Sequence, residues 1–372
     1  RILLKQKGAV TATLGKDVHW YLSGRWMPFF ENGMVSFFQS RPLLEKILRG
    51  YVTEIPNVNF RYDTTFEGPE LDATGKAVRA VRIKSGAQKD SHELRGDLFL
   101  DTTGRGSKVF RHLADRGFPM PLESKVGVDF AYASGLFSLP KAEDEKWRAI
   151  LIYPKAPMET RAAAVVPVEN NRWLVTAAGY SGDHPPLDRE GFLAFIKSLS
   201  QPQIYEALKS ADFLGDLKPF KFKAGIRRHL EKKDCLPDNL LMMGDTICSA
   251  NPFFGQGIAV ATQEAKILQG LCKTEGVDAL CRDAKVRRDY FKRVAAVLDI
   301  SWGLAIGEDF KYETTTGKKP FGFALSRWLK DRIMSSDDPE VARQFYRVMH
   351  FVDPPSSLAS GKILKSILFS DK

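Results

Sequence analysis

The sequence predicts an α/β protein, α+β overall, in which strand–turn–helix units accompany a mainly antiparallel sheet. Three observations support this class. A short apolar run at 240–243 precedes a glycine-rich turn and an amphipathic helix, and a second run at 97–101 has the same order. Between them, from 119 to 222, several strands with alternating apolar side chains follow one another. Beyond residue 276 the pattern is mostly helical.

The unit that begins at residue 240 organises the rest of the chain. The turn residues 237–239 bound the apolar run 240–243, which predicts a strand covered on both faces. Asp245 then lies at the carboxyl end of that strand, where open α/β sheets bind ligands. The following helix is expected to bury one face, formed by Ile258, Ala261, Ala265, Leu268 and Cys272.

The residue types in this unit favour a particular ligand. Gly255 and Gly257 allow close backbone approach, and they open a helix whose first N–H groups lack partners and carry partial positive charge. Asp245 would repel a phosphate but accept hydrogen bonds from hydroxyls. A hydroxyl chain beside Asp245 and an anionic ring beside the helix start together fit a flavin. The alternative is a tight turn with packing glycines and a helix-capping aspartate.

Composition narrows the class of protein. The chain has 372 residues, a formal net charge of +10 and four cysteines without metal-ligand spacing. Buried thiols in a reducing compartment are expected, so the protein is predicted to be cytoplasmic, with no bound metal. The basic charge is spread along the chain, which disfavours nucleic acid and fits anionic cofactors or, peripherally, an anionic membrane surface. No apolar run has the length of a membrane span.

Residues before 119 predict smaller elements. Residues 18–27 and 34–38 are expected to pair as a hairpin. Ser40 is expected to cap a helix with an apolar stripe at Leu44, Ile47, Leu48 and Tyr51. A glycine turn after 97–101 leads into a helix at 108–116. A small antiparallel meander is expected at 57–66, 77–85 and 92–94, with turns at 68–69 and 85–86.

The sheet region carries aromatic side chains that suit a pocket. Its strands are predicted at 125–137, 149–153, 162–167 and 172–179, followed by a helix at 189–199. Phe130, Tyr132 and Tyr153 supply the apolar surface. His184 is a candidate base, although a histidine in a proline-rich turn is more often structural. Later helices are expected at 282–298, 323–334, 339–350 and 362–368, the last of them either docked or in contact with a membrane.

Several strings resemble one known family. The residues Gly244-Asp245, Asn251-Pro252, Gly255-Gln256-Gly257 and Ala261 resemble the second flavin motif of the FAD-dependent monooxygenases with the p-hydroxybenzoate hydroxylase fold, the aromatic-hydroxylase-like superfamily. The turn from Asp97 through Gly104 to Ser107 resembles its middle motif, and Arg41 matches its flavin-nucleotide arginine. The motifs occur in the family's order, and the chain looks most similar to the epoxidase-like branch.

The resemblance implies a domain arrangement. A discontinuous Rossmann-like FAD domain would comprise 1–17, 41–118 and 223–275, and the sheet domain for substrate 18–40 and 119–222. A helical region would form 276–372. The family's amino-terminal Gly-x-Gly-x-x-Gly turn is not found, so we expect the first βαβ unit to be missing from this chain.

The resemblance also implies a reaction. Reduced FAD would react with O₂ to a C4a-hydroperoxide and pass one oxygen to a small hydrophobic, aromatic or alkene substrate, by epoxidation or hydroxylation. Electrons would come from NAD(P)H or from a partner flavin reductase. Phe253 would join the pocket, and no catalytic acid or base is identified. Residues expected at the cofactor are Arg41, Gly104, Gly244, Asp245, Pro252, Gly255, Gln256 and Gly257.

Three other functions are considered as alternatives. The same motifs occur in flavin-dependent reductases of isoprenoid double bonds, and oxygen dependence of turnover would separate these from monooxygenases. A flavin-free binding protein on the same fold is the alternative from a different class. A flavin halogenase is less favoured because the sequence has no Trp-x-Trp-x-Ile-Pro string.

Overall fold

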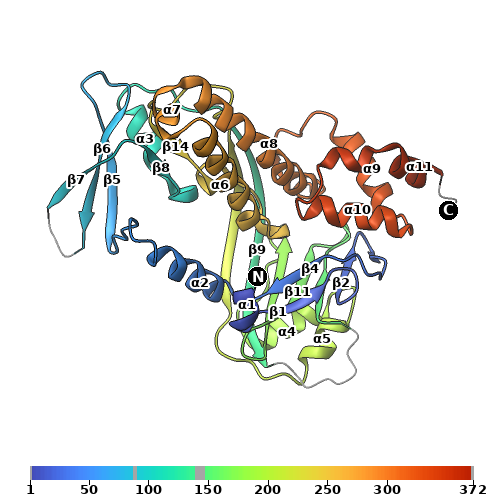
Figure 1. Cartoon of the computed structure of the whole chain (residues 1–372). Coiled ribbons are helices and arrows are strands. Elements are labelled where there is room, and N and C mark those ends of the chain that lie inside the picture. The colour runs from blue at the N-terminus through green and yellow to red at the C-terminus, as the bar shows by residue number, and fades with distance from the viewer. Residues whose placement is uncertain (1, 87–89, 139–146, 370–372) are drawn as a thin grey trace.

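The computed structural model describes residues 2–86, 90–138 and 147–369. One end of the molecule holds a small lobe with the predicted strand–turn–helix units, and the large sheet lies below it in Figure 1. The helix α8 (Ala284–Asp309) runs from that lobe toward a group of carboxyl-terminal helices at the other end. This mixed α/β architecture with a helical carboxyl-terminal region agrees with the predicted class.

The large sheet is mainly antiparallel, as predicted. Within the described residues it has nine strands in the order β15-β13-β9-β12-β11-β10-β2-β3, with β16 paired to β9. Among the described strands of this sheet, only β10 and β2 pair in parallel. The bounds are β2 Val18–Leu22, β3 Arg25–Trp26, β9 Glu123–Ser138, β10 Ala149–Ile152, β11 Arg161–Val168, β12 Arg172–Tyr180, β13 Lys218–Arg228, β15 Cys248–Ser249 and β16 Thr316–Gly317.

Two features of this sheet differ from the prediction. The expected hairpin of 18–27 with 34–38 is wrong, because Ser23 and Gly24, both with positive φ, turn β2 directly into β3. Strand β4 (Val35–Phe38) pairs instead with β1 (Val10–Thr13). Strand β13 was not predicted, although apolar side chains alternate with lysines from Phe220 to Ile226.

Helices cover the sheet on both sides. The helices α4 (Arg189–Lys197) and α5 (Gln203–Leu208) pack on one face, where their apolar side chains share a core with Phe137, Val165 and Trp173. Asp188 caps α4 by accepting a hydrogen bond from the Gly191 amide at 2.7 Å. The opposite face contacts the carboxyl-terminal helices through a second core that contains Trp20, Phe345 and Tyr346.

The small lobe contains the two predicted strand–turn units side by side. Strand β14 (Leu240–Met242) is buried along its whole length and runs parallel to β8 (Phe99–Asp101). This confirms the strand covered on both faces. Asn239 joins the pair to the neighbouring meander, because its Oδ1 accepts a hydrogen bond from the Val78 amide at 2.7 Å. The helix α3 (Val109–Ala114) follows β8.

The meander is present with a shifted first strand. It consists of β5 (Thr64–Leu71), β6 (Val78–Ser85) and β7 (Ser91–Arg95), all antiparallel. The predicted strand at 57–66 and the turn at Gly68-Pro69 are wrong. Strand β5 runs through both residues, and a register shift between Phe66 and Gly68 accommodates them.

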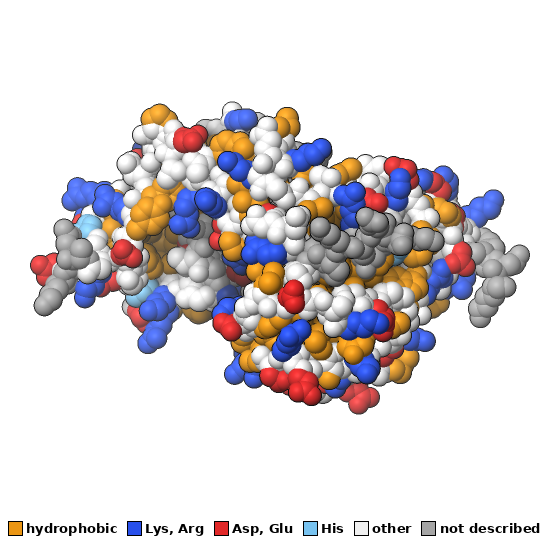
Figure 2. Space-filling view, turned by 90° about the horizontal axis from the view of Figure 1, so that it is seen from below, with side chains coloured by type: hydrophobic (Ala, Val, Ile, Leu, Met, Phe, Trp, Pro, Cys, Tyr) orange, Lys and Arg blue, Asp and Glu red, His pale blue; other side chains and the backbone are white. Residues whose placement is uncertain are grey.

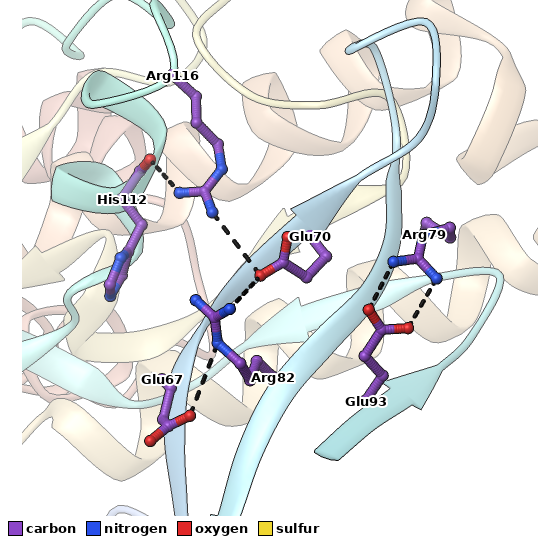
Figure 3. A network of polar contacts seen from close by, with 7 residues as sticks. All are labelled: Glu67, Glu70, Arg79, Arg82, Glu93, His112 and Arg116. Carbon is purple, nitrogen blue, oxygen red and sulfur yellow. Dashed lines mark hydrogen bonds and ion pairs between the residues drawn. The ribbon is translucent and has the colours of Figure 1, made fainter. Parts of the chain in front are cut away.

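Surface ion pairs tie this meander together (Figure 3). Arg82 lies between Glu67 at 3.7 Å and Glu70 at 3.1 Å, and Arg116 beyond α3 also approaches Glu70, at 3.9 Å. A separate bidentate pair joins Arg79 of β6 to Glu93 of β7, at 2.6 and 2.7 Å. Exposed pairs of this kind each contribute little to the free energy of unfolding, and we assign them no role in binding or catalysis.

The helix α6 (Gly257–Thr274) begins where predicted but buries only part of the predicted face. Its buried side chains are Val260, Glu264 and Leu271, whereas Ile258 is 52% exposed. The helix packs against α8 and against the turn after β14, and the amide of that turn binds Glu264. Of the expected face, Leu268 and Cys272 pack against the core, whereas Ile258 and Ala265 are exposed, so the prediction is only partly right. The buried face also includes a polar contact, that of Glu264 with the Gly244 amide.

The remaining helices lie close to their predicted positions. Ser40 caps α2 (Arg41–Thr53) as expected, by accepting a hydrogen bond from the Leu43 amide at 3.2 Å, but the stripe on this helix stays largely in solvent. Helix α8 extends to residue 309, beyond the predicted end at 298. The others are α1 Ile2–Gln6, α7 Val277–Arg282, α9 Phe323–Met334, α10 Pro339–Met349 and α11 Gly361–Phe369.

The last helix is docked. Ile363 and Ile367 of α11 are buried in the same core as Tyr346. This confirms the docked reading of the tail over the membrane-bound one. Among the described helices, none has the length and apolar character needed to span a bilayer. On the face shown in Figure 2, lysine and arginine side chains are scattered among acidic ones and form no single patch.

Candidate functional site

The two glycine turns of the small lobe meet at Asp245. Gly244 leaves β14 with a φ of +68°, and Gly104 leaves the neighbouring strand β8 with a φ of +81°. The Gly104 amide donates to Thr246 Oγ1 at 2.9 Å. A Cβ built on Gly104 would lie 3.8 Å from Asp245 Cβ. The structure thus places Gly104, Gly244 and Asp245, all predicted site residues, in one corner.

The Asp245 carboxylate is exposed and, among the described residues, has no hydrogen bond or ion pair. The pKa of Asp245 is raised because neighbouring atoms partly exclude water from it, while the charges of Arg105 and Arg41 act in the opposite direction. Arg41 begins α2 and pairs with Glu45 at 2.6 Å. The carboxylate is therefore free to accept hydrogen bonds from a ligand.

A buried glutamate that sequence reasoning missed positions this turn. Glu264 of α6 is fully buried, and its Oε2 accepts a hydrogen bond from the Gly244 amide at 2.5 Å. Burial raises the pKa of Glu264 to about 7, although the Gly244 amide and Arg227 both oppose the shift. An acidic residue at a core position of a helix was the signal that could have identified it.

The loop between β15 and α6 is held in a fixed shape. Asn251 Oδ1 accepts a hydrogen bond from the Phe253 amide at 3.2 Å, and Gly255 has a φ of +65°. Gln256 donates from Nε2 to the Met349 carbonyl at 3.1 Å, which ties the loop to α10. A Cβ added to Gly255 or Gly257 would meet no atom within 4 Å. The start of α6 therefore faces open space.

A buried polar cluster anchors this loop from below. Asn251 Nδ2 donates to Asp309 Oδ1 at 2.7 Å and lies 3.0 Å from the Tyr180 hydroxyl. That hydroxyl also donates to Asp309 Oδ1 at 3.2 Å. Asp309, at the end of α8, is 2% exposed, and burial raises its pKa to about 7 against the effect of both hydrogen bonds. Sequence reasoning missed Asp309, because no local pattern links it to Asn251.

An aromatic cavity of about 300 Å³ lies beside the loop. Phe253 contacts Tyr153 and Phe130, with ring centroids 4.5 and 5.7 Å apart. The Tyr153 hydroxyl donates to the Phe253 carbonyl at 3.2 Å. Polar groups on the wall include the hydroxyls of Ser134 and Thr176, 2.7 Å apart. The other lining residues are Tyr132, Ile152, Ala162, Ala163, Ala164, Ala178 and Pro252.

The four residues predicted for a substrate pocket thus lie around one cavity. Pro252 and Phe253 connect it to the open start of α6. His184 does not line the cavity, since its Nε2 contacts Asp129 Oδ1 at 2.9 Å in a surface turn. The structure brings Gly244 and Asp245 together with Gly104, and it holds Pro252 to Gly257 in the loop beside the cavity. Arg41 makes no hydrogen bond to Asp245 among the described residues, but its charge acts on the carboxylate.

Replacing Asn251 by alanine should lower the free energy of unfolding by about 2–3 kcal/mol. The change removes the cap on the Phe253 amide and leaves the buried oxygens of Asp309 and Tyr180 with fewer partners. Urea unfolding at pH 7 measures this loss. The exposed residue Asn57 provides the control, because Asn57→Ala should leave the midpoint unchanged. An equal midpoint for both variants would contradict the anchoring role.

Comparison of the sequence with known proteins finds one distant relative. The sequence matches no protein-family profile. It is 25% identical to "Protein Rv3254" of Mycobacterium tuberculosis over 326 residues, which is 86% of this chain and 67% of that protein. That level of identity indicates a distant relative, and the printed name of the relative states no activity.

Three solved structures have a similar fold. A flavoprotein/dehydrogenase from Cytophaga hutchinsonii matches with a TM-score of 0.68 and 14% identity, over 98% of this chain and 82% of that one. The flavin-dependent brominase Bmp2 gives 0.67 and 12%, over 94% and 79%. The p-nitrophenol 4-monooxygenase PnpA from Pseudomonas putida gives 0.62 and 15%, over 93% and 82%. The chain therefore has the fold of flavin-dependent monooxygenases and halogenases.

Proposed function

We propose that this protein is an FAD-dependent monooxygenase that transfers one oxygen atom from O₂ to a small, largely apolar substrate. One observation carries the proposal. The unpaired Asp245 carboxylate, the open start of α6 and the aromatic cavity all belong to or adjoin the single segment 244–257. The fold around that segment is one that flavin-dependent enzymes share.

The residues present fit the flavin ring and the ribityl chain of FAD. Asp245 would accept hydrogen bonds from the hydroxyls of the ribityl chain, and the amides at 255–257 would lie near the electron-rich edge of the ring. The positive φ of Gly244, Gly104 and Gly255 keeps the backbone open at each turn. When bound, the flavin supplies the reaction with oxygen, and the chain supplies orientation and exclusion of water. Arg41 and Arg105 would favour the anionic portion of the cofactor.

The cavity indicates the substrate class. A volume of about 300 Å³ suits a small molecule. The rings of Phe130, Tyr153 and Phe253 offer edges and faces to an aromatic ring or an alkene. The pair Ser134 and Thr176 provides hydroxyls at one wall, which would orient a single polar substituent. Epoxidation and hydroxylation both suit such a pocket.

The electron donor, the domain limits and the cellular location are also part of the proposal. Electrons would reach the flavin from NAD(P)H or from a separate flavin reductase. The domain limits that the sequence predicts remain proposals as well, although β13 crosses the boundary at residue 223 and belongs to the large sheet along its whole length. We place the protein in the cytoplasm.

The decisive experiment uses the full-length protein loaded with FAD. The flavin is reduced anaerobically and then mixed with oxygen and a panel of small alkenes and phenols. We expect oxygen uptake, a transient change in flavin absorbance, and one labelled oxygen atom in the product when ¹⁸O₂ is used.

Other outcomes assign the alternatives. Saturation of a double bond without oxygen would show the reductase. A product that is halogenated only when chloride or bromide is present would show a halogenase. Failure to retain any flavin, with the fold intact by circular dichroism, would show a flavin-free binding protein. Each of these results overturns the monooxygenase proposal.

A further inference from the structure

The segment at the start of α9 exposes three large apolar side chains. Phe321 is 107% exposed, Leu325 68% and Trp328 49%. Leu325 and Trp328, three residues apart, lie on one side of α9, and Phe321 lies in the turn ahead of its N-cap Gly322. The inner side of α9 already buries Ile333 and Met334. Among the described residues, these three side chains belong to none of the core clusters, and their exposure indicates a binding surface.

Positive charge flanks these side chains. Lys318 and Lys319 precede Phe321 and are exposed, and Arg327 lies between Leu325 and Trp328 in the sequence. The sequence from 318 to 330 contains no aspartate or glutamate. Asp331 follows, 3.8 Å from Arg327 in an exposed pair, and Lys330 bonds inward to the buried Glu308. Along the chain, Lys318, Lys319 and Arg327 thus flank the apolar side chains, and Asp331, which faces Arg327, is the first carboxylate after them.

A basic cavity of about 350 Å³ opens along the same helix. Its walls include Arg25, Lys155, Lys311 and Arg327, with Met158, which is 68% exposed. Arg25 is paired with Asp337 and Lys311 with Glu308, so part of this charge is neutralised. Lys155 has no side-chain partner among the described residues. Asp331 also lines this cavity and faces Arg327, so Lys155 is its cation without a side-chain partner among the described residues.

We propose that residues 318–328 bind the surface of an anionic lipid bilayer. The three apolar side chains are exposed, and none of them lines the cavities given above for the described part of the chain. A bilayer interface accepts isolated aromatic and aliphatic side chains, and tryptophan is favoured there. Lysine and arginine beside them match the phosphates of anionic lipids. The helix α11 cannot serve instead, because Ile363 and Ile367 are buried.

Flotation of the full-length protein with lipid vesicles tests this surface. We expect binding to vesicles of phosphatidylcholine with about one third phosphatidylserine and much weaker binding to phosphatidylcholine alone. The double variant F321S/W328S should lose at least about tenfold in partitioning. The variant K318E/K319E should lose binding to the anionic vesicles, and about 0.5 M salt should have the same effect.

Tyr51 on α2 provides the matched control. It is 54% exposed and belongs to a different apolar surface, formed by α1 and α2. Tyr51→Ser should bind vesicles as the wild type does, and all variants should unfold at the same urea concentration, since the changed side chains are exposed.

Four results would overturn the proposal. They are no binding to either vesicle, equal binding by F321S/W328S, loss of binding in Tyr51→Ser alone, or a lipid-free dimer that F321S/W328S abolishes. The last would assign the surface to a second copy of the chain. None of these outcomes depends on whether the protein binds FAD.

Discussion

As the pH rises from 5 to 8, Asp309 and Glu264 should each lower the free energy of unfolding by about 2–3 kcal/mol. Both carboxyls are buried, and burial raises the pKa of each to about 7. The unfolded chain ionises them near pH 4, so the native state holds more protons between pH 4 and pH 7. Their contribution is thus fully present below pH 4 and is lost as the pH rises through 7.

The variants Asp309→Asn and Glu264→Gln isolate this effect. Each amide keeps an acceptor oxygen for the existing hydrogen bonds and cannot titrate. Relative to wild type, each variant should gain about 2–3 kcal/mol of unfolding free energy on going from pH 5 to pH 8. Urea unfolding across this range measures the difference.

Comparison with wild type also cancels the contribution of the histidines to the pH dependence of stability. Burial lowers the pKa values of His19, His112 and His350, which reduces stability at acid pH. These groups are unchanged in the variants and cancel. The charge of Glu308 acts on Asp309, and Glu308 with its partners Lys311 and Lys330 is also retained. The exposed Asp216 supplies a control, and a parallel curve for Asp309→Asn and Asp216→Asn would refute the assignment.

Replacing Asp245 by alanine should weaken FAD binding by about ten- to a hundredfold, or 1.4–2.8 kcal/mol. The carboxylate is the acceptor that we assign to the ribityl hydroxyls, and it lies exposed beside Gly104. Several hydroxyl contacts are shared, so the loss stays within this range. Asp245→Asn keeps one acceptor oxygen and should lose less. Fluorescence titration of the full-length apoprotein with FAD gives both affinities.

Stability separates a binding role from a structural one. Asp245 has no partner among the described residues, so Asp245→Ala should change the unfolding free energy of the apoprotein by less than about 0.5 kcal/mol. Asp234, exposed on another turn, serves as the control for both measurements. Unchanged FAD affinity in Asp245→Ala would contradict the assignment of Asp245 to the cofactor site. A large loss of stability would instead show that the aspartate has a structural role as a cap.

Much of the local structure followed from the sequence. The strand at 240–242, the helix that begins at Gly257 and the capped helix after Ser40 lie where the patterns predict them. So do the four strands of the large sheet between 123 and 180. Each depends on neighbouring residues alone: a turn residue, a cap, or a period of two or of three to four.

Pairing and orientation did not follow in the same way. The predicted hairpin failed because a two-residue turn at Ser23 competes with the later glycine turn, and strand β4 has its partner in β1. The predicted face of α6 is only partly buried, and the buried side includes Glu264, which binds the Gly244 amide twenty residues away. A hydrophobic period cannot anticipate a polar contact that forms only when two elements meet.

The sequence by itself therefore determined the types of element, the order of the glycine motifs and the aromatic character of the pocket. The tertiary structure decided which residues meet. Gly104 reaches Thr246 across 142 residues, and Asn251 reaches Asp309 across 58 and Tyr180 across 71. Burial of a carboxyl depends on all the elements that surround it. The sequence marks Glu264 only as an acidic residue at a core position of a helix, and the raised pKa values of Asp309 and Glu264 follow from the tertiary structure.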